Sequence, residues 1–426
     1  MKRSILALLL LGMACPSLTS CGGESASTPT PTPTPSPPRA ISGVAPTLVA
    51  TLESPWSLAF LPDGRMLVTQ LPSGTASTAD PAAPGALRLV TPSGAISDPI
   101  GGLPTNIGLL EVKLDPNYTN NRMIYISFLE SDANAPRVGR NAAEPGGIPI
   151  GLALARGTLR FTGNTAYLDN AAVIWRQMPK IVSPGPSGEP GGRMTFSPDG
   201  RYLFLTAGDR QELDKTFLHS LDNSLGKIIR IYPDGAIPSD NPYRAQAGAL
   251  PELWSIGHRN PYGIAFDSKG VLWEHEMGPK GGDELNRIQP GLNYGWPAVS
   301  YGNHYDDGAI PKPAEGDGFA PSTFWWTPVI APSDMIFYSG ALFADWRGDA
   351  IISGLASHTL VRVRINGDSA TEVQRIDMGA RIRAVQQGLT ARCGCWRISR
   401  AAACSSLRRC SPPDHGWPVL WQAGSL

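Results

Sequence analysis

The sequence has no cysteine in the long stretch between Cys21 and Cys393, although it contains six in all. Charged side chains are also few, at 17% of 426 residues, and the 36 basic residues balance the 36 acidic ones. A neutral chain without a long basic run has no overall attraction for nucleic acid, which excludes that class of partner. A hydrophobic content of 42% excludes a disordered polyelectrolyte. We expect the folded body of the chain to use no cysteine.

The sequence is rich in glycine and proline, which break regular secondary structure, and shows little helical periodicity. Glycine (47) and proline (41) together make up about a fifth of the residues. This composition argues against a helical bundle and predicts many short strands joined by turns. The length allows two or three domains of average size, but large all-β folds often form a single domain.

The N-terminus has the pattern of a bacterial export signal. Lys2 and Arg3 precede an apolar run over residues 5–11, which is too short to span a bilayer as a stable helix. The segment ends in Leu-Thr-Ser-Cys at Cys21, which matches the lipobox of bacterial lipoproteins, where the cysteine thiol is lipidated. An ordinary signal peptide with a chance cysteine is the alternative. We predict a signal peptide over residues 1–20 and a lipid on Cys21.

The segment after Cys21 is rich in proline, threonine and serine and includes a Thr-Pro alternation from Thr28 to Pro35. Such a segment stays extended and cannot bury a core. We therefore expect residues 21–43 to tether a folded domain to a membrane through the lipid anchor only. Gly22 rather than aspartate follows the cysteine, so we expect the bacterial cell envelope, at the outer membrane, facing the periplasm or the exterior.

The body of the chain repeats one hairpin pattern. A short apolar strand, a turn that is Pro-Asp-Gly in the clearest cases, and a second short strand recur every 50 to 80 residues or so, at roughly the spacing of propeller blades. Aspartate and glycine supply the turn geometry that other residues resist. The pattern predicts an all-β fold, a β-propeller, with a β-sandwich as the alternative. Five hairpins are visible, at 57–69, 112–127, 194–206, 263–273 and 335–353, and a sixth begins at 381–388.

The tail from Leu389 onward does not continue this pattern. A Pro-Asp-Gly turn should follow Gly388, yet the sequence reads Leu-Thr-Ala-Arg-Cys-Gly-Cys. Synonymous codons exist for which a frame shifted by one base encodes Pro-Asp-Gly-Ala-Val-Trp-Val-Leu-Glu-Asp-Leu, the missing turn and strand. We therefore expect residues 389–426 to be an aberrant, frameshifted tail that leaves the last blade incomplete, which resequencing of the gene would test. A four-cysteine zinc site or a disulfide knot is the alternative, although Cys393 and Cys395 lack C-x-x-C spacing.

Two motifs in the second half of the chain are more distinctive. The first reads Trp-Ser-Ile-Gly-His-Arg-Asn-Pro-Tyr-Gly over 254–263. The second reads Glu-His-Glu-Met-Gly-Pro-Lys-Gly-Gly-Asp-Glu-Leu-Asn over 274–286, and Asn-Tyr-Gly-Trp-Pro follows at 293–297. With the hairpins and an Arg-Ile-Arg element at 381–383, they make residues 44–388 resemble the soluble PQQ-dependent aldose/glucose dehydrogenases, the glucose/sorbosone dehydrogenase family.

This resemblance implies a six-bladed propeller that holds PQQ, a tricarboxylate quinone, together with a calcium ion. It also implies oxidation of the C1 hydroxyl of an aldose sugar to a lactone, with a quinone or cytochrome as electron acceptor. Arg259 and Asn260 match the pair that contacts the quinone, where a fixed cation stabilises the charge that arrives with hydride. Arg381 and Arg383 match two arginines that hold PQQ, and their i, i+2 spacing puts them on one strand face. Arg-x-Arg alone is more often a solvated face.

The resemblance also implies a calcium site and an aromatic neighbour. Gly278 and Pro279 match the positions whose backbone carbonyls ligate the ion, and calcium prefers such hard oxygen ligands. Trp326 matches an aromatic residue beside the cofactor.

Three positions depart from the family pattern. Glu189, within Gly-Glu-Pro-Gly-Gly-Arg, stands where the family has its histidine base. Asn106 replaces a glutamine near the substrate, and Ala356 replaces a cofactor-binding lysine. Histidine suits hydroxyl deprotonation because its pKa lies near neutrality, whereas a glutamate pKa of about 4.3 makes a weaker base unless burial raises it. We predict that Glu189, Arg259 and Asn106 form the catalytic site.

The sequence contains no motif that indicates a different kind of enzyme. It contains no dinucleotide fingerprint, P-loop or Ser-His-Asp motif. His258 and His275 are not metal ligands in the family, and the histidines form no HxxH or HExxH pattern. We predict an aldose dehydrogenase, and the alternative is a non-catalytic propeller lipoprotein that acts as a binding module.

Overall fold

The computed structural model describes residues 44–72, 84–131, 147–162, 165–182, 188–211, 214–388, 393–398 and 402–409. The predicted signal peptide, Cys21 and the tether lie outside these residues. Within them, helical structure is limited to α1 (Tyr118–Asn121), α2 (Lys215–His219) and the short 3₁₀ helix η1 (Ala344–Trp346). No helix in this described part is long and apolar enough to cross a membrane.

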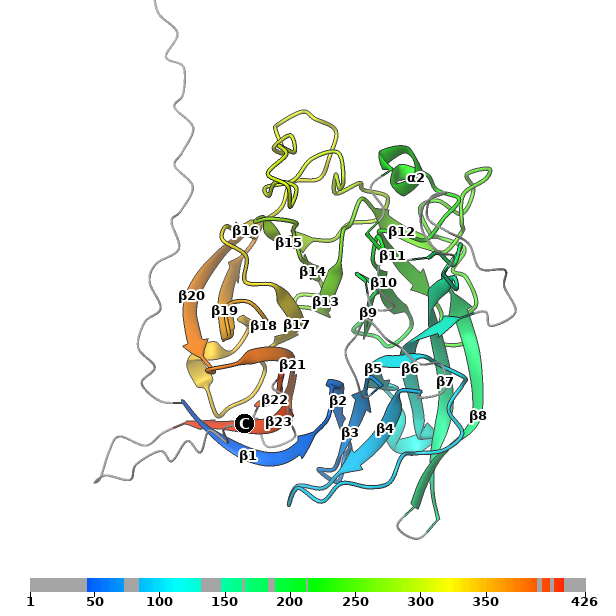
Figure 1. Cartoon of the computed structure of the whole chain (residues 1–426), viewed down its shortest axis with the longest axis vertical. Coiled ribbons are helices and arrows are strands. Elements are labelled where there is room, and N and C mark those ends of the chain that lie inside the picture. The colour runs from blue at the N-terminus through cyan, green and yellow to red at the C-terminus, as the bar shows by residue number, and fades with distance from the viewer. Residues whose placement is uncertain are drawn as a thin grey trace, which may run out of the picture. The chain divides into compact units, whose positions relative to one another are not determined.

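The strands form antiparallel sheets, most of them built from consecutive strands (Figure 1). Four sheets have four strands in chain order. They are β5 (Gly108–Leu114), β6 (Met123–Ser131), β7 (Ile150–Thr162) and β8 (Thr165–Arg176); β9 (Gly191–Phe196), β10 (Leu203–Ala207), β11 (Lys227–Ile231) and β12 (Leu253–Ile256); β13 (Pro261–Phe266), β14 (Leu272–Glu276), β15 (Asp283–Arg287) and β16 (Phe324–Trp326); and β17 (Pro332–Phe337), β18 (Ala350–Gly354), β19 (Thr359–Asn366) and β20 (Ser369–Asp377). A three-stranded sheet contains β2 (Pro55–Phe60), β3 (Met66–Gln70) and β4 (Ala86–Val90). The predicted β-propeller is confirmed.

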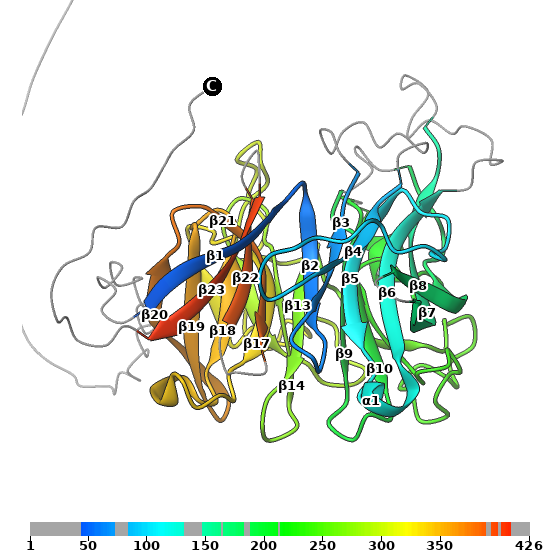
Figure 2. The same ribbon diagram turned by 90° about the horizontal axis from the view of Figure 1, so that it is seen from below.

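The remaining sheet combines strands from the two ends of the described chain. Its order is β1 (Val44–Leu52), β23 (Ala402–Arg409), β22 (Cys393–Ile398) and β21 (Arg381–Gln387), and β1 runs antiparallel beside β23 (Figure 2). Two of these strands lie in the tail that we expected to leave the last blade incomplete. That expectation is wrong, because this sheet has four strands. The physical reason is that Cys393 and Cys395 are small, apolar and buried, and belong to the same core cluster as Ile382 and Val385.

All five predicted hairpins are present, and their first strands resemble one another. In β2, β9, β13 and β17, four buried residues are followed by two that are partly buried. The Pro-Asp-Gly turn between β2 and β3 has Gly64 at φ 86° and a hydrogen bond from the backbone N–H of Arg65 to Asp63. The local sequence therefore sets each hairpin, as its turn residues predict.

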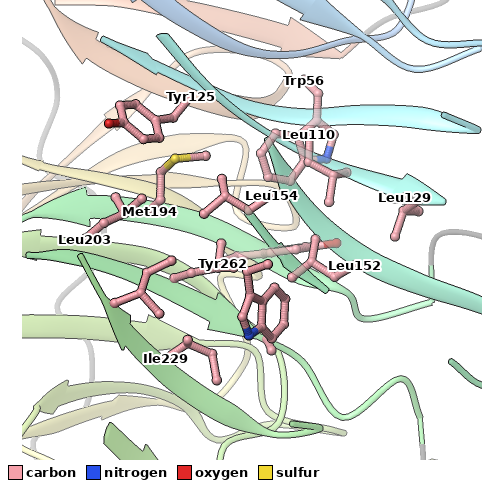
Figure 3. Close-up of a cluster of buried hydrophobic side chains, with 14 of the residues drawn as sticks. Trp56, Leu110, Tyr125, Leu129, Leu152, Leu154, Met194, Leu203, Ile229 and Tyr262 are labelled. Carbon is pink, nitrogen blue, oxygen red and sulfur yellow. The ribbon is translucent and has the colours of Figure 1, made fainter. Parts of the chain in front are cut away.

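Hydrophobic side chains fill the space between neighbouring sheets. One cluster joins β5–β7 to β9–β11 through Leu110, Leu152, Leu154, Met194 and Ile229 (Figure 3). Trp56 of β2 and Tyr262 of β13 belong to the same cluster. The first strands of several sheets are thus packed together, which positions the polar groups that these strands carry.

Candidate active site

Each of four first strands has an irregular residue near its start. The pairing registers of β2, β13, β17 and β21 with their neighbours shift by one residue there, which is the mark of a β-bulge. The extra residues are Trp56, Tyr262, Ser333 and Arg383. A bulge removes a residue from the regular ladder, so its carbonyl needs another hydrogen-bond donor.

Arg193 supplies that donor for three of the four bulges. Its Nε donates to the carbonyls of Tyr262 (3.1 Å) and Ser333 (3.0 Å), and its Nη2 donates to those of Ser333 (2.7 Å) and Arg383 (3.0 Å). The guanidinium also lies 3.9 Å from the centroid of the Trp56 ring. Arg193 is 1% exposed. A single buried cation therefore connects the first strands of five sheets.

Arg259 lies between β12 and β13 and is buried among carbonyls and carboxylates. Its Nη1 donates to the carbonyls of Met277 and Gly278, both at 2.9 Å, and its Nη2 is 2.5 Å from Glu189 Oε1. Burial by itself would lower the pKa of Arg259, but the carboxylates of Glu189 and Asp209 outweigh it and raise that pKa. The site therefore contains a permanent cation.

The partly buried Glu189 and the fully buried Asp209 form a pair of carboxyl groups beside this cation. Burial and the neighbouring Glu189 carboxylate raise the pKa of Asp209 well above its usual range. The Asp209 side chain accepts hydrogen bonds from Trp296 Nε1 (2.7 Å) and from the backbone N–H of Gln211 (2.8 Å). Burial and the neighbouring carboxylate therefore both favour the protonated form of Asp209, while Glu189 pairs with Arg259.

The local backbone explains how Glu189 reaches this position. Glu189 has a φ of 42°, and Gly191 and Gly192 follow at 65° and 94°. Only glycine adopts such values without strain, so the two glycines let the chain turn sharply before Arg193 enters β9. The turn puts Glu189 against Arg259.

Two further predicted residues lie close to this group. Asn260 accepts a hydrogen bond from the backbone N–H of Gly191 at 3.4 Å. Arg383 donates from Nη1 to Ser333 Oγ at 3.2 Å and lies 5.6 Å from the centroid of the Tyr262 ring. Burial lowers the pKa of Arg383 to about 10, and the charge of Arg193 acts in the same direction. Excess positive charge at this position suits an anionic ligand.

Other predicted residues are not brought into this group. Trp326 is 1% exposed in the core beside β20, where its Nε1 donates to Glu372 at 2.8 Å. Strand alternation instead leaves Trp325 half-buried and stacked on Tyr301, with ring centroids 4.0 Å apart. Asn106 uses both ends of its amide locally, accepting from the Gly85 N–H and donating to the Pro104 carbonyl.

The remaining predicted residues, Arg381, Gly278 and Pro279, differ in how far they are buried. Arg381 is exposed at the start of β21. Pro279 is buried, and the Gly278 carbonyl accepts the bond from Arg259 described above. A Cβ on residue 278 would lie 2.3 Å from the carbonyl oxygens of both Gly281 and Gly282. Only glycine fits here, and backbone oxygens gather around it.

Sequence reasoning missed three residues of the site. Asp209 comes two residues after the fully buried strand β10, and a carboxylate just after an apolar strand was the available signal. Tyr305 is 70% exposed, yet its hydroxyl accepts a hydrogen bond from Arg259 Nη2 at 3.3 Å. Arg193 was visible only as the last residue of the glycine-rich motif. Nothing in the sequence indicates that it reaches three other strands.

These observations define a β-propeller protein with a buried arginine–carboxylate site among the first strands of its sheets. A family model described as Glucose / Sorbosone dehydrogenase matches residues 52–393. The chain belongs to the glucose/sorbosone dehydrogenase family.

Known proteins similar to this chain include several sugar dehydrogenases. The aldose sugar dehydrogenase YliI of Escherichia coli (strain K12) is 34% identical over 348 residues, which are 79% of this chain and 85% of that protein. The quinoprotein glucose dehydrogenase B of Acinetobacter calcoaceticus is 28% identical over 273 residues, which are 59% of this chain and 52% of that protein. A crystal structure of a glucose dehydrogenase is 35% identical with a TM-score of 0.74, covering 85% of this chain and 99% of that one.

Proposed function

We propose that this protein is a PQQ-dependent dehydrogenase that oxidises the C1 hydroxyl of aldose sugars to lactones. The observation that carries the proposal is the Glu189 carboxylate held 2.5 Å from the buried Arg259. It puts a base and a fixed cation at one place, which is what removal of a hydroxyl proton and transfer of a hydride both need. The sugar dehydrogenases among the similar proteins support the substrate class.

The residues present fit PQQ. Arg259, Arg383 and Arg193 are three buried or half-buried cations, and the described residues offer no hydrogen-bond acceptor to Arg259 Nε or Arg193 Nη1. A ligand that carries several carboxylates would supply such acceptors. We propose that Arg259, Asn260 and Arg383 hold the cofactor, with Arg381 at the rim of the site.

The residues also fit calcium, since the backbone oxygens around Gly278 are hard ligands of the kind that calcium prefers. Gly278 and Pro279 would hold the ion through their carbonyls. Because the Gly278 carbonyl accepts a bond from Arg259 in the present structure, that guanidinium would have to give up one contact when calcium binds.

In the proposed reaction, PQQ when bound supplies a quinone as the hydride acceptor. Glu189 takes the proton of the sugar's C1 hydroxyl on Oε2, the carboxylate oxygen that does not make the ion pair with Arg259. Arg259 holds Glu189 in an ion pair and offers positive charge where negative charge develops. Asp209 retains its proton and positions Glu189, while Trp296 Nε1 positions Asp209. Asn106 would act beside the substrate only if its loop moved. A quinone or cytochrome would then accept the electrons.

The proposed activity is tested by dye reduction with purified protein, added PQQ and calcium, and a panel of aldoses. We expect reduction that depends on sugar, PQQ and calcium together, and none with NAD in place of PQQ. The assay should be run on this chain and on a frame-restored chain. Failure of the restored chain both to bind PQQ and to reduce dye would contradict the proposal and favour a non-catalytic binding module.

We further propose that β2–β4 act as a sixth blade and that residues 389–426 are read from a shifted frame. Contacts of β2 with both β5 and β21 support a closed ring of six sheets. The shifted frame would place valine at 393 and 395, where the two buried cysteines now lie. Valine fills such positions with more apolar surface than cysteine, so the restored chain should also be the more stable of the two.

We propose that the protein is a lipid-anchored lipoprotein of the bacterial cell envelope, attached at the outer membrane and facing the periplasm or the exterior. The Leu-Thr-Ser-Cys motif before the Pro/Thr/Ser-rich tether supports this. In cells fed labelled palmitate, we expect label on the parent protein and none on Cys21→Ala. Equal labelling of the two proteins would contradict lipidation at Cys21.

A further inference from the structure

Three ionisable side chains form a second polar group behind Arg259. Glu274 and Glu276 lie two residues apart on β14 and therefore on one face of the strand, and His258 precedes Arg259 in the connection from β12 to β13. All three are buried, with exposed fractions of 0%, 3% and 0%. One donor atom from each lies within 4.8 Å of the other two. His258 Nδ1 is 3.6 Å from Glu276 and 3.9 Å from Glu274, and both distances are within twice a zinc–ligand distance of about 2.1 Å, so one ion could bridge the imidazole and the carboxylates.

Several buried polar atoms of these residues and of the neighbouring Asn286 have no hydrogen-bond partner among the described residues. His258 Nδ1 is 3.6 Å from Glu276 Oε1 and 3.9 Å from Glu274 Oε2, yet it makes no hydrogen bond. Glu274 Oε1 and Asn286 Oδ1, both fully buried, also have no hydrogen-bond partner among the described residues. Each such atom costs free energy unless something occupies the space between them.

The His258 ring is held in the orientation that a metal ligand requires. Its other nitrogen, Nε2, is hydrogen-bonded to Ser255 Oγ at 2.9 Å, and its ring stacks on Tyr294 with centroids 4.9 Å apart. A hydrogen bond on one ring nitrogen fixes the tautomer and directs the other nitrogen at the ion.

The charges in this group are not balanced by protein. Among the described residues, no lysine or arginine forms an ion pair with Glu274 or Glu276. Asn286 Nδ2 reaches Glu274 Oε2 (3.2 Å) and Glu276 Oε1 (3.3 Å), but an amide is neutral. Buried carboxylates are normally paired with a cation or coordinate a metal.

We propose that His258, Glu274 and Glu276 bind a divalent metal ion through His258 Nδ1 and the two carboxylates. One imidazole nitrogen and carboxylate oxygens suit zinc or manganese better than the all-oxygen preference of calcium. This site differs from the calcium site proposed at Gly278 and Pro279, because its ligands are the side chains of His258, Glu274 and Glu276 and not those backbone carbonyls. The second oxygen of Glu276 accepts a hydrogen bond from the backbone N–H of Arg259. The ion would thereby fix the segment that carries Arg259.

The test uses the full chain, purified without chelator and without added PQQ or calcium, with zinc and manganese as probes. We expect about one zinc or manganese ion per chain by mass spectrometry. After stripping, saturating zinc or manganese should raise the Tm by about 3 °C or more. Glu274→Gln replaces one anionic ligand with a neutral group of the same shape and should weaken binding by about 100-fold or more.

Glu252→Gln is the matched control, since it removes a different buried carboxylate, one that accepts a bond from Trp175 Nε1. It should bind the ion as the parent chain does. Absence of any bound ion or Tm shift in the parent chain would overturn the proposal. So would equal binding by parent and Glu274→Gln, which would place the ion elsewhere. A more stable Glu274→Gln without metal binding by the parent would show instead that the carboxylates share a proton. This test does not measure sugar oxidation. A protein that fails to oxidise sugars would therefore contradict the proposed function and not the metal site.

Discussion

Replacing Glu189 with glutamine should lower kcat for aldose oxidation by about 10²- to 10⁴-fold, the usual contribution of a general base. Glutamine keeps the shape of the side chain and can still accept a hydrogen bond from Arg259, but it cannot take a proton. The measurement is steady-state dye reduction by PQQ-loaded protein, with PQQ binding followed separately by absorbance. We expect PQQ to bind the variant, so that the loss lies in kcat.

Asp209→Asn is the matched control for this prediction. If Asp209 carries the shared proton, the neutral asparagine copies its state and can still accept the hydrogen bond from Trp296 Nε1. It should therefore lower kcat far less than Glu189→Gln does. Glu189→His should keep activity, with an acid limb near the ordinary histidine pKa of about 6.5. If Asp209→Asn proves more damaging than Glu189→Gln, the base has been assigned to the wrong carboxyl group.

Replacing Arg193 with leucine should destabilise the fold by about 3–5 kcal/mol, the usual effect of removing one partner of a buried charged network. The change leaves the carbonyls of Tyr262, Ser333 and Arg383 without their donor. It also leaves Asp334, which lies 3.7 Å from Arg193 Nη1, without its nearby cation. Urea titration followed by tryptophan fluorescence measures the loss.

Two companion variants make this result interpretable. Arg201→Leu alters an exposed arginine that lies over the Tyr202 ring in the same sheet, and it should change stability little. Arg193→Lys keeps the charge but cannot reach three carbonyls with one planar fork, so it should lie between parent and Arg193→Leu. If Arg193→Leu unfolds at the same urea concentration as Arg201→Leu, Arg193 does not hold the bulges together.

Much of the architecture could be predicted from the sequence because it is local. A Pro-Asp-Gly turn such as the one at Gly64 sets its own hairpin, since the backbone angles it needs are available to few residues. Strand alternation likewise follows from short-range pattern. The tail was read less well, because burial of Cys393 and Cys395 depends on a sheet completed by β1 from the other end of the described chain.

The candidate site was predicted only in part. Glu189 and Arg259 could be matched to family positions one at a time, but their contact could not, since they are 70 positions apart in the chain. For Trp326 the predicted position itself was wrong by one residue. A shift of one residue moves a side chain to the other face of a strand, and Trp326 consequently lies in the core while Trp325 faces Tyr301.

The sequence by itself determined the class of fold, the family and the kinds of charged residue available, because turns, alternation and motifs are properties of neighbouring residues. The tertiary structure alone decided which of these residues meet. It raised the pKa of Asp209 by burying it beside Glu189, made Arg193 the shared donor of three bulges, and brought His258 to Glu274 and Glu276. These outcomes depend on burial and on contacts between distant segments, which exist only once the sheets have packed.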